Sequence, residues 1–161
     1  LPTVEPINGT SFNDSYVFNG STDYGYNISE QGTAFAGATG SEMAHLFYNT
    51  LDNKGLCDPA TSTASSCIYQ PGYGLANTGP FTSLQVEDIY WSATQYGTSP
   101  SRAWLFVMSE GAQVESFKTE TYYALAVSPG DVAAVPEPEA WGLLLSGLAL
   151  VGWAARRRNT R

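Results

Sequence analysis

Short apolar segments separated by turn residues fill the second half of this chain. The alternation of apolar and polar positions predicts strands over residues 89–95, 103–108, 113–118 and 122–127. In residues 103–108 apolar side chains fall on both faces, so we expect a central strand that is covered on both sides. Ser109-Glu110-Gly111 has the composition of a hairpin turn, in which the glycine takes a positive φ. The pattern predicts an antiparallel sheet.

The first half of the chain carries a different pattern. Residues 1–40 are dense in Asn, Gly, Ser and Tyr and predict irregular loop, with a short strand near residues 15–18. Residues 40–51 predict a helix, because Met43, Leu46, Phe47 and Leu51 recur at a spacing of three to four. Thr39 and Glu42 have the spacing of a capping box at its start. Together these elements predict a loop-rich α+β fold.

The C-terminal residues combine three unlike features in a fixed order. Pro136, Glu137 and Pro138 come first, and their prolines disfavour a helix. An apolar run without charge follows, and its members include Trp141, Gly142, Leu143, Leu144, Leu145, Leu148, Leu150, Val151 and Trp153. Arg156, Arg157 and Arg158 then form a basic stop, which the positive-inside rule places on the cytoplasmic side. This order predicts a C-terminal membrane anchor with the rest of the chain outside the cytoplasm.

The predicted anchor is short for a permanent membrane span. Residues 140–155 cover about 24 Å as a helix, against the roughly 30 Å of a hydrocarbon core. The segment resembles the PEP-CTERM sorting domain of bacterial exosortase substrates over residues 135–161. That resemblance implies recognition of Pro136-Glu137-Pro138 by an exosortase, a membrane-embedded, cysteine-protease-like sortase. It also implies passage through the inner membrane, and then transfer to the cell surface or extracellular matrix. A plain tail anchor and a buried apolar helix are the alternatives.

Charge and cysteines narrow the class of protein further. Residues 1–140 contain three of the seven basic residues and all fifteen acidic ones, a formal net charge of −12. We therefore expect no nucleic-acid partner, since such partners need a basic footprint. Outside the cytoplasm Cys57 and Cys67 favour a disulfide, worth about 2–3 kcal/mol, over free thiols. Without histidine partners they do not predict a zinc site, and we expect no metal and no cofactor.

A second resemblance covers about residues 1–129. Tyr90-Trp91-Ser92-Ala93-Thr94-Gln95-Tyr96, Ala103-Trp104-Leu105-Phe106, Gly111-Ala112-Gln113 and Tyr122-Tyr123-Ala124 are similar to the Lcl C-terminal family. This family is a bacterial domain of unknown function that is related to C-type-lectin-like folds. Leu1-Pro2-Thr3 resembles the second half of its Trp-Arg-Leu-Pro-Thr signature. The resemblance therefore implies an N-terminally truncated domain over 1–129, a Pro/Glu linker over 130–139 and the sorting segment.

These features favour a noncatalytic surface protein, with an adhesive or recognition role toward extracellular polysaccharide. One alternative is a secreted hydrolase that uses paired carboxylates among Glu87, Asp88, Glu110 and Glu115. The chain has no nucleophile or metalloprotease motif, and its single histidine, His45, has no evident partner, so we name no catalytic residue. A truncated remnant without function is the third alternative. For Trp91, Trp104, Tyr122 and Tyr123, sheet core is the simpler expectation than ligand contact.

Overall fold

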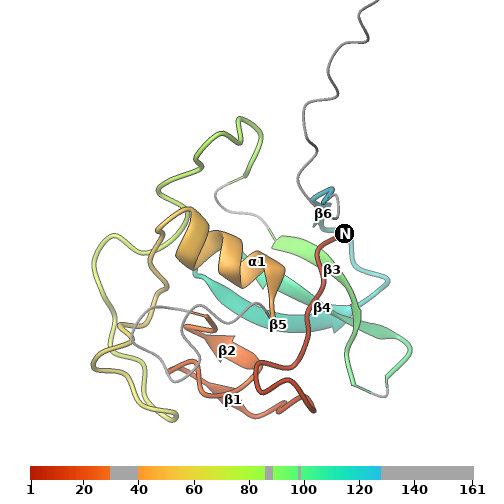
Figure 1. Cartoon of the computed structure of the whole chain (residues 1–161), viewed down its shortest axis with the longest axis horizontal. Helices are drawn as coiled ribbons and strands as arrows, with labels where there is room; N and C mark the ends of the chain where they lie inside the picture. The colour runs from red at the N-terminus through yellow and green to blue at the C-terminus, as the bar shows by residue number, and fades with distance from the viewer. Residues whose placement is uncertain (30–39, 86–88, 98, 128–161) are drawn as a thin grey trace, which may run out of the picture. The chain divides into compact units, whose positions relative to one another are not determined.

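One mixed sheet organises residues 1–29, 40–85, 89–97 and 99–127, the residues that the computed structural model describes (Figure 1). Six strands in the order β1-β2-β5-β4-β3-β6 form this sheet within those residues. The strands are β1 (Tyr16–Val17), β2 (Tyr24–Tyr26), β3 (Ile89–Gln95), β4 (Arg102–Val107), β5 (Ala112–Phe117) and β6 (Tyr123–Ala124). They are joined by long loops and accompanied by one short helix, α1 (Glu42–His45), which continues as a π-helical turn, η1 (Leu46–Thr50). Residues Leu1–Val127 form one compact unit.

The central strands agree closely with the sequence prediction. β3 has the predicted bounds, and β4 and β5 each begin one residue earlier than predicted. β4 lies between β3 and β5, antiparallel to both, and its residues 103–106 are buried. Gly111, at the turn between β4 and β5, has φ of 69°, as the hairpin prediction requires. The central strand covered on both sides is therefore confirmed.

The edges of the sheet differ from the prediction. β6 has two residues instead of six and runs parallel to β3, because the chain crosses from β5 to the far side of β3 before it pairs. At the other edge β2, which lies in residues predicted as loop, pairs with β5, and β1 pairs parallel with β2. The short strand predicted near residues 15–18 is thus confirmed as β1. The prediction of a wholly antiparallel sheet was wrong, because β1 with β2 and β3 with β6 pair in parallel, and one edge of the sheet comes from the first thirty residues.

The helix occupies the predicted region, but the predicted cap was wrong. Ser41 is the N-cap, and its hydroxyl accepts a hydrogen bond from the Ala44 amide at 3.3 Å. Glu42 does not cap the helix, because its carboxylate accepts hydrogen bonds from the amide and the hydroxyl of Thr3. Thr39, the predicted partner, lies outside the described residues.

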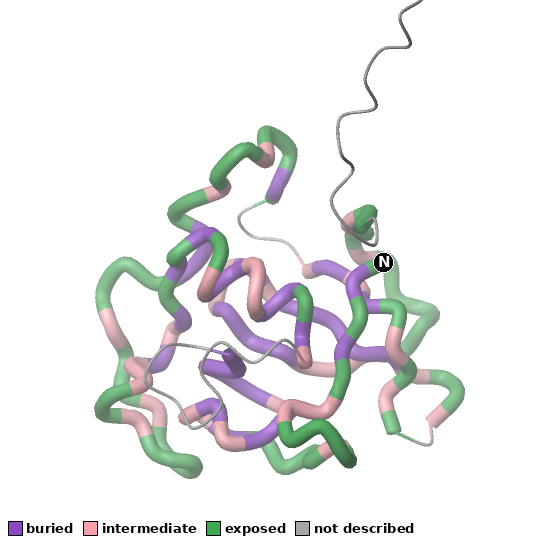
Figure 2. The backbone as a smooth tube through the Cα atoms, in the orientation of Figure 1, coloured by how far each residue is buried: buried purple, intermediate pink, exposed green. Residues whose placement is uncertain are grey.

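The helix packs its apolar face on the sheet and forms the main core. Phe47 is fully buried, and its ring lies 5.4 Å from that of Phe106 on β4. Figure 2 shows buried positions along the helix and the central strands, with exposed positions on the outer loops. The buried residues of this main core are Ile28, Met43, Ala44, Phe47, Tyr48, Leu51, Leu75, Leu84, Tyr90, Phe106 and Met108.

The first residues of the chain fill an irregularity in β3. The register of β3 against β4 shifts between Trp91 and Gln95, which leaves backbone groups unpaired by β4. The Ala93 amide donates instead to the Pro2 carbonyl at 2.7 Å, and the Thr94 hydroxyl donates to the Val4 carbonyl at 3.0 Å. Figure 1 shows this N-terminal segment running past β3. The opening residues are therefore an integral part of the folded unit.

Candidate functional site

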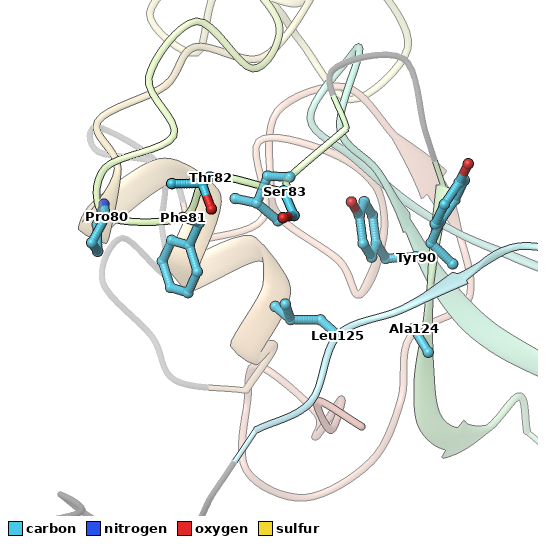
Figure 3. A pocket seen from close by; sticks show the side chains of 9 residues that line it. Pro80, Phe81, Thr82, Ser83, Tyr90, Ala124 and Leu125 are labelled. Carbon is cyan, nitrogen blue, oxygen red and sulfur yellow. The ribbon is translucent and has the colours of Figure 1, made fainter.

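A groove lies between one loop and the β6 edge of the sheet. It has a volume of about 380 Å³ and is lined by Pro80, Phe81, Thr82, Ser83, Leu84, Tyr90, Tyr123, Ala124 and Leu125. We call it the Tyr123 groove. Figure 3 shows Pro80 to Ser83 along one side, with Tyr90, Ala124 and Leu125 along the other. Its size falls within the range of small-molecule sites.

Two asparagines fix the loop that forms one side of the groove. The Asn53 carboxamide oxygen accepts from the amides of Ala76 and Asn77, at 2.9 and 2.7 Å, and its nitrogen donates to the Asn77 carbonyl. The Asn77 side chain donates to the Leu51 carbonyl at 2.8 Å. Gly79, with φ of 54°, passes so close to Leu51 that a Cβ would lie 2.8 Å from it. The loop therefore enters the groove from a fixed position at the end of the helix.

The sheet register places two tyrosines together at the other side. Tyr90 and Tyr123 are paired residues of the parallel strands β3 and β6, and their ring centroids are 5.7 Å apart. Tyr90 is 3% exposed, and its hydroxyl accepts a hydrogen bond from the Gln85 amide at 2.9 Å. Tyr123 is 52% exposed. The buried ring thus supports the exposed one and also ties the loop to the sheet.

The four aromatic residues considered from the sequence divide between core and surface. Trp104 is fully buried on β4, which confirms the expectation that it belongs to the core. Trp91 and Tyr122 are half-buried, and their ring centroids are 5.2 Å apart. Tyr123 departs from the core expectation and is open to solvent. Sequence reasoning missed the loop side of the groove, because residues 80–84 carry no motif and reach Tyr123 through tertiary contacts alone.

A second hollow, of about 450 Å³, lies beside the helix. It is lined by Thr3, Glu5, Glu42, His45, Leu46 and Thr50. His45 Nδ1 lies 3.5 Å from the Thr50 hydroxyl, and the Glu42 carboxylate is engaged by Thr3. Within the residues that the structure describes, no group of three His, Cys, Asp or Glu side chains is placed to hold a metal ion.

The carboxylates considered for hydrolysis have structural partners where the structure describes them. Glu110 accepts a hydrogen bond from the Tyr26 hydroxyl at 2.6 Å, and Glu115 forms an ion pair with Arg102. Burial, reinforced by the hydrogen bond to Glu110, raises the pKa of the Tyr26 hydroxyl, so Tyr26 stays a neutral donor. Glu87 and Asp88 lie outside the described residues.

Cys57 and Cys67 are joined by a disulfide bond, with 5.1 Å between their Cα atoms. This is the pairing expected from the sequence. The Cys57 carbonyl also accepts hydrogen bonds from the side chains of Asn27 and Gln70, at 2.9 and 3.2 Å. The disulfide therefore anchors its loop to a buried point of the core instead of closing a free surface loop.

The predicted sorting residues, membrane anchor and basic stop, residues 136–158, lie outside the described residues, as do the linker and the boundary predicted at residue 129. In the part that is described, no helix has the length and apolar character needed to cross a membrane. The structure therefore leaves these assignments as predictions from the sequence.

Comparison with known proteins bears on the C-terminal residues. Residues 134–158 match the family described as the PEP-CTERM protein-sorting motif. No curated protein and no solved structure matches the chain, so the resemblance of residues 1–129 to a C-type-lectin-like domain stays a prediction. The motif match supports an exosortase substrate, a protein exported to the cell surface or the extracellular space through a transient membrane anchor.

Proposed function

We propose that this protein is a noncatalytic recognition protein that an exosortase delivers to the cell surface, where residues 1–127 contact extracellular polysaccharide. The observation that carries the proposal is the sorting motif at residues 134–158. A sorting motif of this kind supports a role outside the cytoplasm. We therefore assign the recognition function to the folded unit, residues 1–127, that precedes the motif.

Two properties of this unit support an extracellular role. The disulfide between Cys57 and Cys67 belongs to an oxidising environment. Residues 1–127 contain three basic and twelve acidic residues, and a formal charge of −9 keeps such a unit soluble and repels anionic lipid and nucleic acid. Both properties suit a protein that is held at a surface and faces an aqueous matrix.

The surroundings of the acidic side chains support a noncatalytic role. A pair of catalytic carboxylates needs one group free to donate a proton and another free to attack or to activate water. Glu110, in the turn between β4 and β5, is held by Tyr26 of β2, and Glu115 of β5 is held by Arg102 of β4. We keep the C-type-lectin-like relationship as part of the proposal, because its four similar segments fall on β3, on β4, at the start of β5 and on β6.

The experiment follows the full chain, exported by a secretory leader, in cells with and without an exosortase. We expect wild-type protein to reach the surface in a shortened form only where the exosortase is present. Glu137→Ala removes the acidic residue of the sorting motif and should abolish shortening. Glu120→Ala changes an exposed acidic residue of the folded unit and is the matched control. Normal shortening of the Glu137→Ala protein would overturn the sorting part of the proposal.

A further inference from the structure

We propose that the Tyr123 groove binds a sugar ring of an uncharged polysaccharide, with the exposed Tyr123 ring as its stacking surface. This inference rests on the proposed function and names the site and the ligand class. The ring of Tyr123 is 52% exposed and lies beside the buried ring of Tyr90. A tyrosine so supported offers a rigid, amphipathic contact at low cost in conformational entropy. The apolar C–H face of a pyranose matches such a ring.

The polar groups of the groove suit the hydroxyls of a sugar. Thr82 and Ser83 are exposed on one side, and the Tyr123 hydroxyl lies on the other. None of these three hydroxyls makes a hydrogen bond within the described ranges of the chain. Each can donate and accept, as a sugar hydroxyl can, so the same groups serve several orientations of the ligand. A purely apolar ligand would leave these hydroxyls without partners.

The floor of the groove gives one face of the ligand an apolar support. Leu84 and Tyr90 are buried there, and Phe81 and Leu125 pack against the same core cluster. Binding sites for small organic rings usually combine an apolar floor with a few polar groups that orient the ligand. The floor belongs to the main core, so the groove is present before any ligand binds.

Charge determines which polysaccharides fit. Among the residues that the structure describes, none that lines the groove is charged. The unit that holds it, residues 1–127, contains three basic and twelve acidic residues, a formal charge of −9. Polymers of uronic acids or sulfated sugars are repelled by such a unit and find no cation in the groove. We therefore assign the groove to neutral sugars, and binding should change little with salt.

The experiment measures binding by calorimetry on the full chain in detergent. The probes are neutral hexasaccharides of glucose, mannose and N-acetylglucosamine, with hexagalacturonate as the anionic comparison. We expect at least one neutral probe to bind and hexagalacturonate to bind more weakly or not at all. Tyr123→Ala should weaken binding about tenfold, which corresponds to about 1.4 kcal/mol. Tyr123→Phe keeps the ring and should retain most of the affinity.

Tyr69→Ala is the matched control, because Tyr69 is 72% exposed and lies two residues after Cys67, outside the groove lining. Circular dichroism checks that each variant is folded. Neutral-sugar binding that persists unchanged in Tyr123→Ala overturns the groove assignment alone. Absence of binding by wild-type protein overturns the recognition function as well. Preference for hexagalacturonate, or binding of an apolar peptide at this groove in place of sugar, also overturns the assignment.

Discussion

Two aromatic clusters of this sheet differ in how completely the fold encloses them. Trp104 lies on the central strand β4 and is fully buried, with the rings of Phe12, Tyr24 and Tyr96 within 6 Å of its own. Tyr123 lies on the two-residue strand β6 and is 52% exposed. A central strand has neighbours on both sides, whereas an edge strand leaves one side open. The position of each strand in the sheet therefore determines whether its aromatic residue is buried in the core or accessible to a ligand.

Removing the buried aromatic should have the largest effect on stability. We expect Trp104→Ala to lower the free energy of unfolding by about 3–5 kcal/mol, because it leaves a cavity among three aromatic rings. Trp104→Phe should cost less, since the indole N–H has no hydrogen-bond partner among the described residues. Tyr123→Ala should cost about 1 kcal/mol or less. Urea titrations measure all three, and equal losses for Trp104→Ala and Tyr123→Ala would contradict the comparison.

Removing the asparagine behind the groove should have the next largest effect. Asn53→Ala deletes three hydrogen bonds to residues 76 and 77, and we expect a loss of about 3 kcal/mol in unfolding free energy. Asn8→Ala is the control, because the hydrogen bonds of the Asn8 side chain to described residues stay within its own exposed turn. Urea titration gives the loss. A loss no larger than that of Asn8→Ala would show that the loop is not fixed by Asn53.

Removing the disulfide should have an intermediate effect on stability and should leave the Tyr123 groove intact. Replacing Cys57 and Cys67 together by alanine should lower the free energy of unfolding by about 2–3 kcal/mol. Because neither cysteine lines the groove, the affinity of the groove for sugar should persist. A double variant that is as stable as wild type, or that no longer binds sugar although it is folded, would contradict this prediction.

The smallest effect concerns a buried carboxylate close to the Trp104 cluster. Burial raises the pKa of Asp23, although backbone amides of Asn13 and Ile7 oppose the shift by donating to it. The folded state then binds the proton more tightly than the unfolded state, so this contribution to stability falls as pH rises above the ordinary carboxyl range. The advantage of wild type over Asp23→Asn in melting temperature should therefore narrow from about pH 4 towards neutrality. A gap that widens over this interval would contradict the direction of the shift.

Local patterns predicted the elements that local chemistry controls. The bounds of β3 and the turn at Gly111 follow from alternation and from the demand for positive φ. The buried face of the helix likewise follows from its spacing. The N-cap was misplaced, because Ser41 and Thr39 both offer a hydroxyl near the helix start and the choice depends on tertiary contacts of Glu42 with Thr3.

Features that depend on long-range pairing were not predicted. β2 has three residues with Gly25 at its centre, which gives no strand pattern, and it forms because β5 offers an open edge. The Tyr123 groove exists because the β3–β6 register brings Tyr123 beside Tyr90 and because Asn53 and Asn77 place the loop opposite. Nothing in the local sequence of residues 80–84 predicts that this loop lies opposite Tyr123.

The most direct test of the account is the intact mass of the protein recovered from the cell surface. In cells with an exosortase, we expect a mass below that of the full chain, reduced by loss of the residues that follow the sorting motif. In cells without it, the full mass should remain with the membrane. Full-length protein at the surface of both cell types would contradict delivery by sorting, and with it the proposed role of the folded unit.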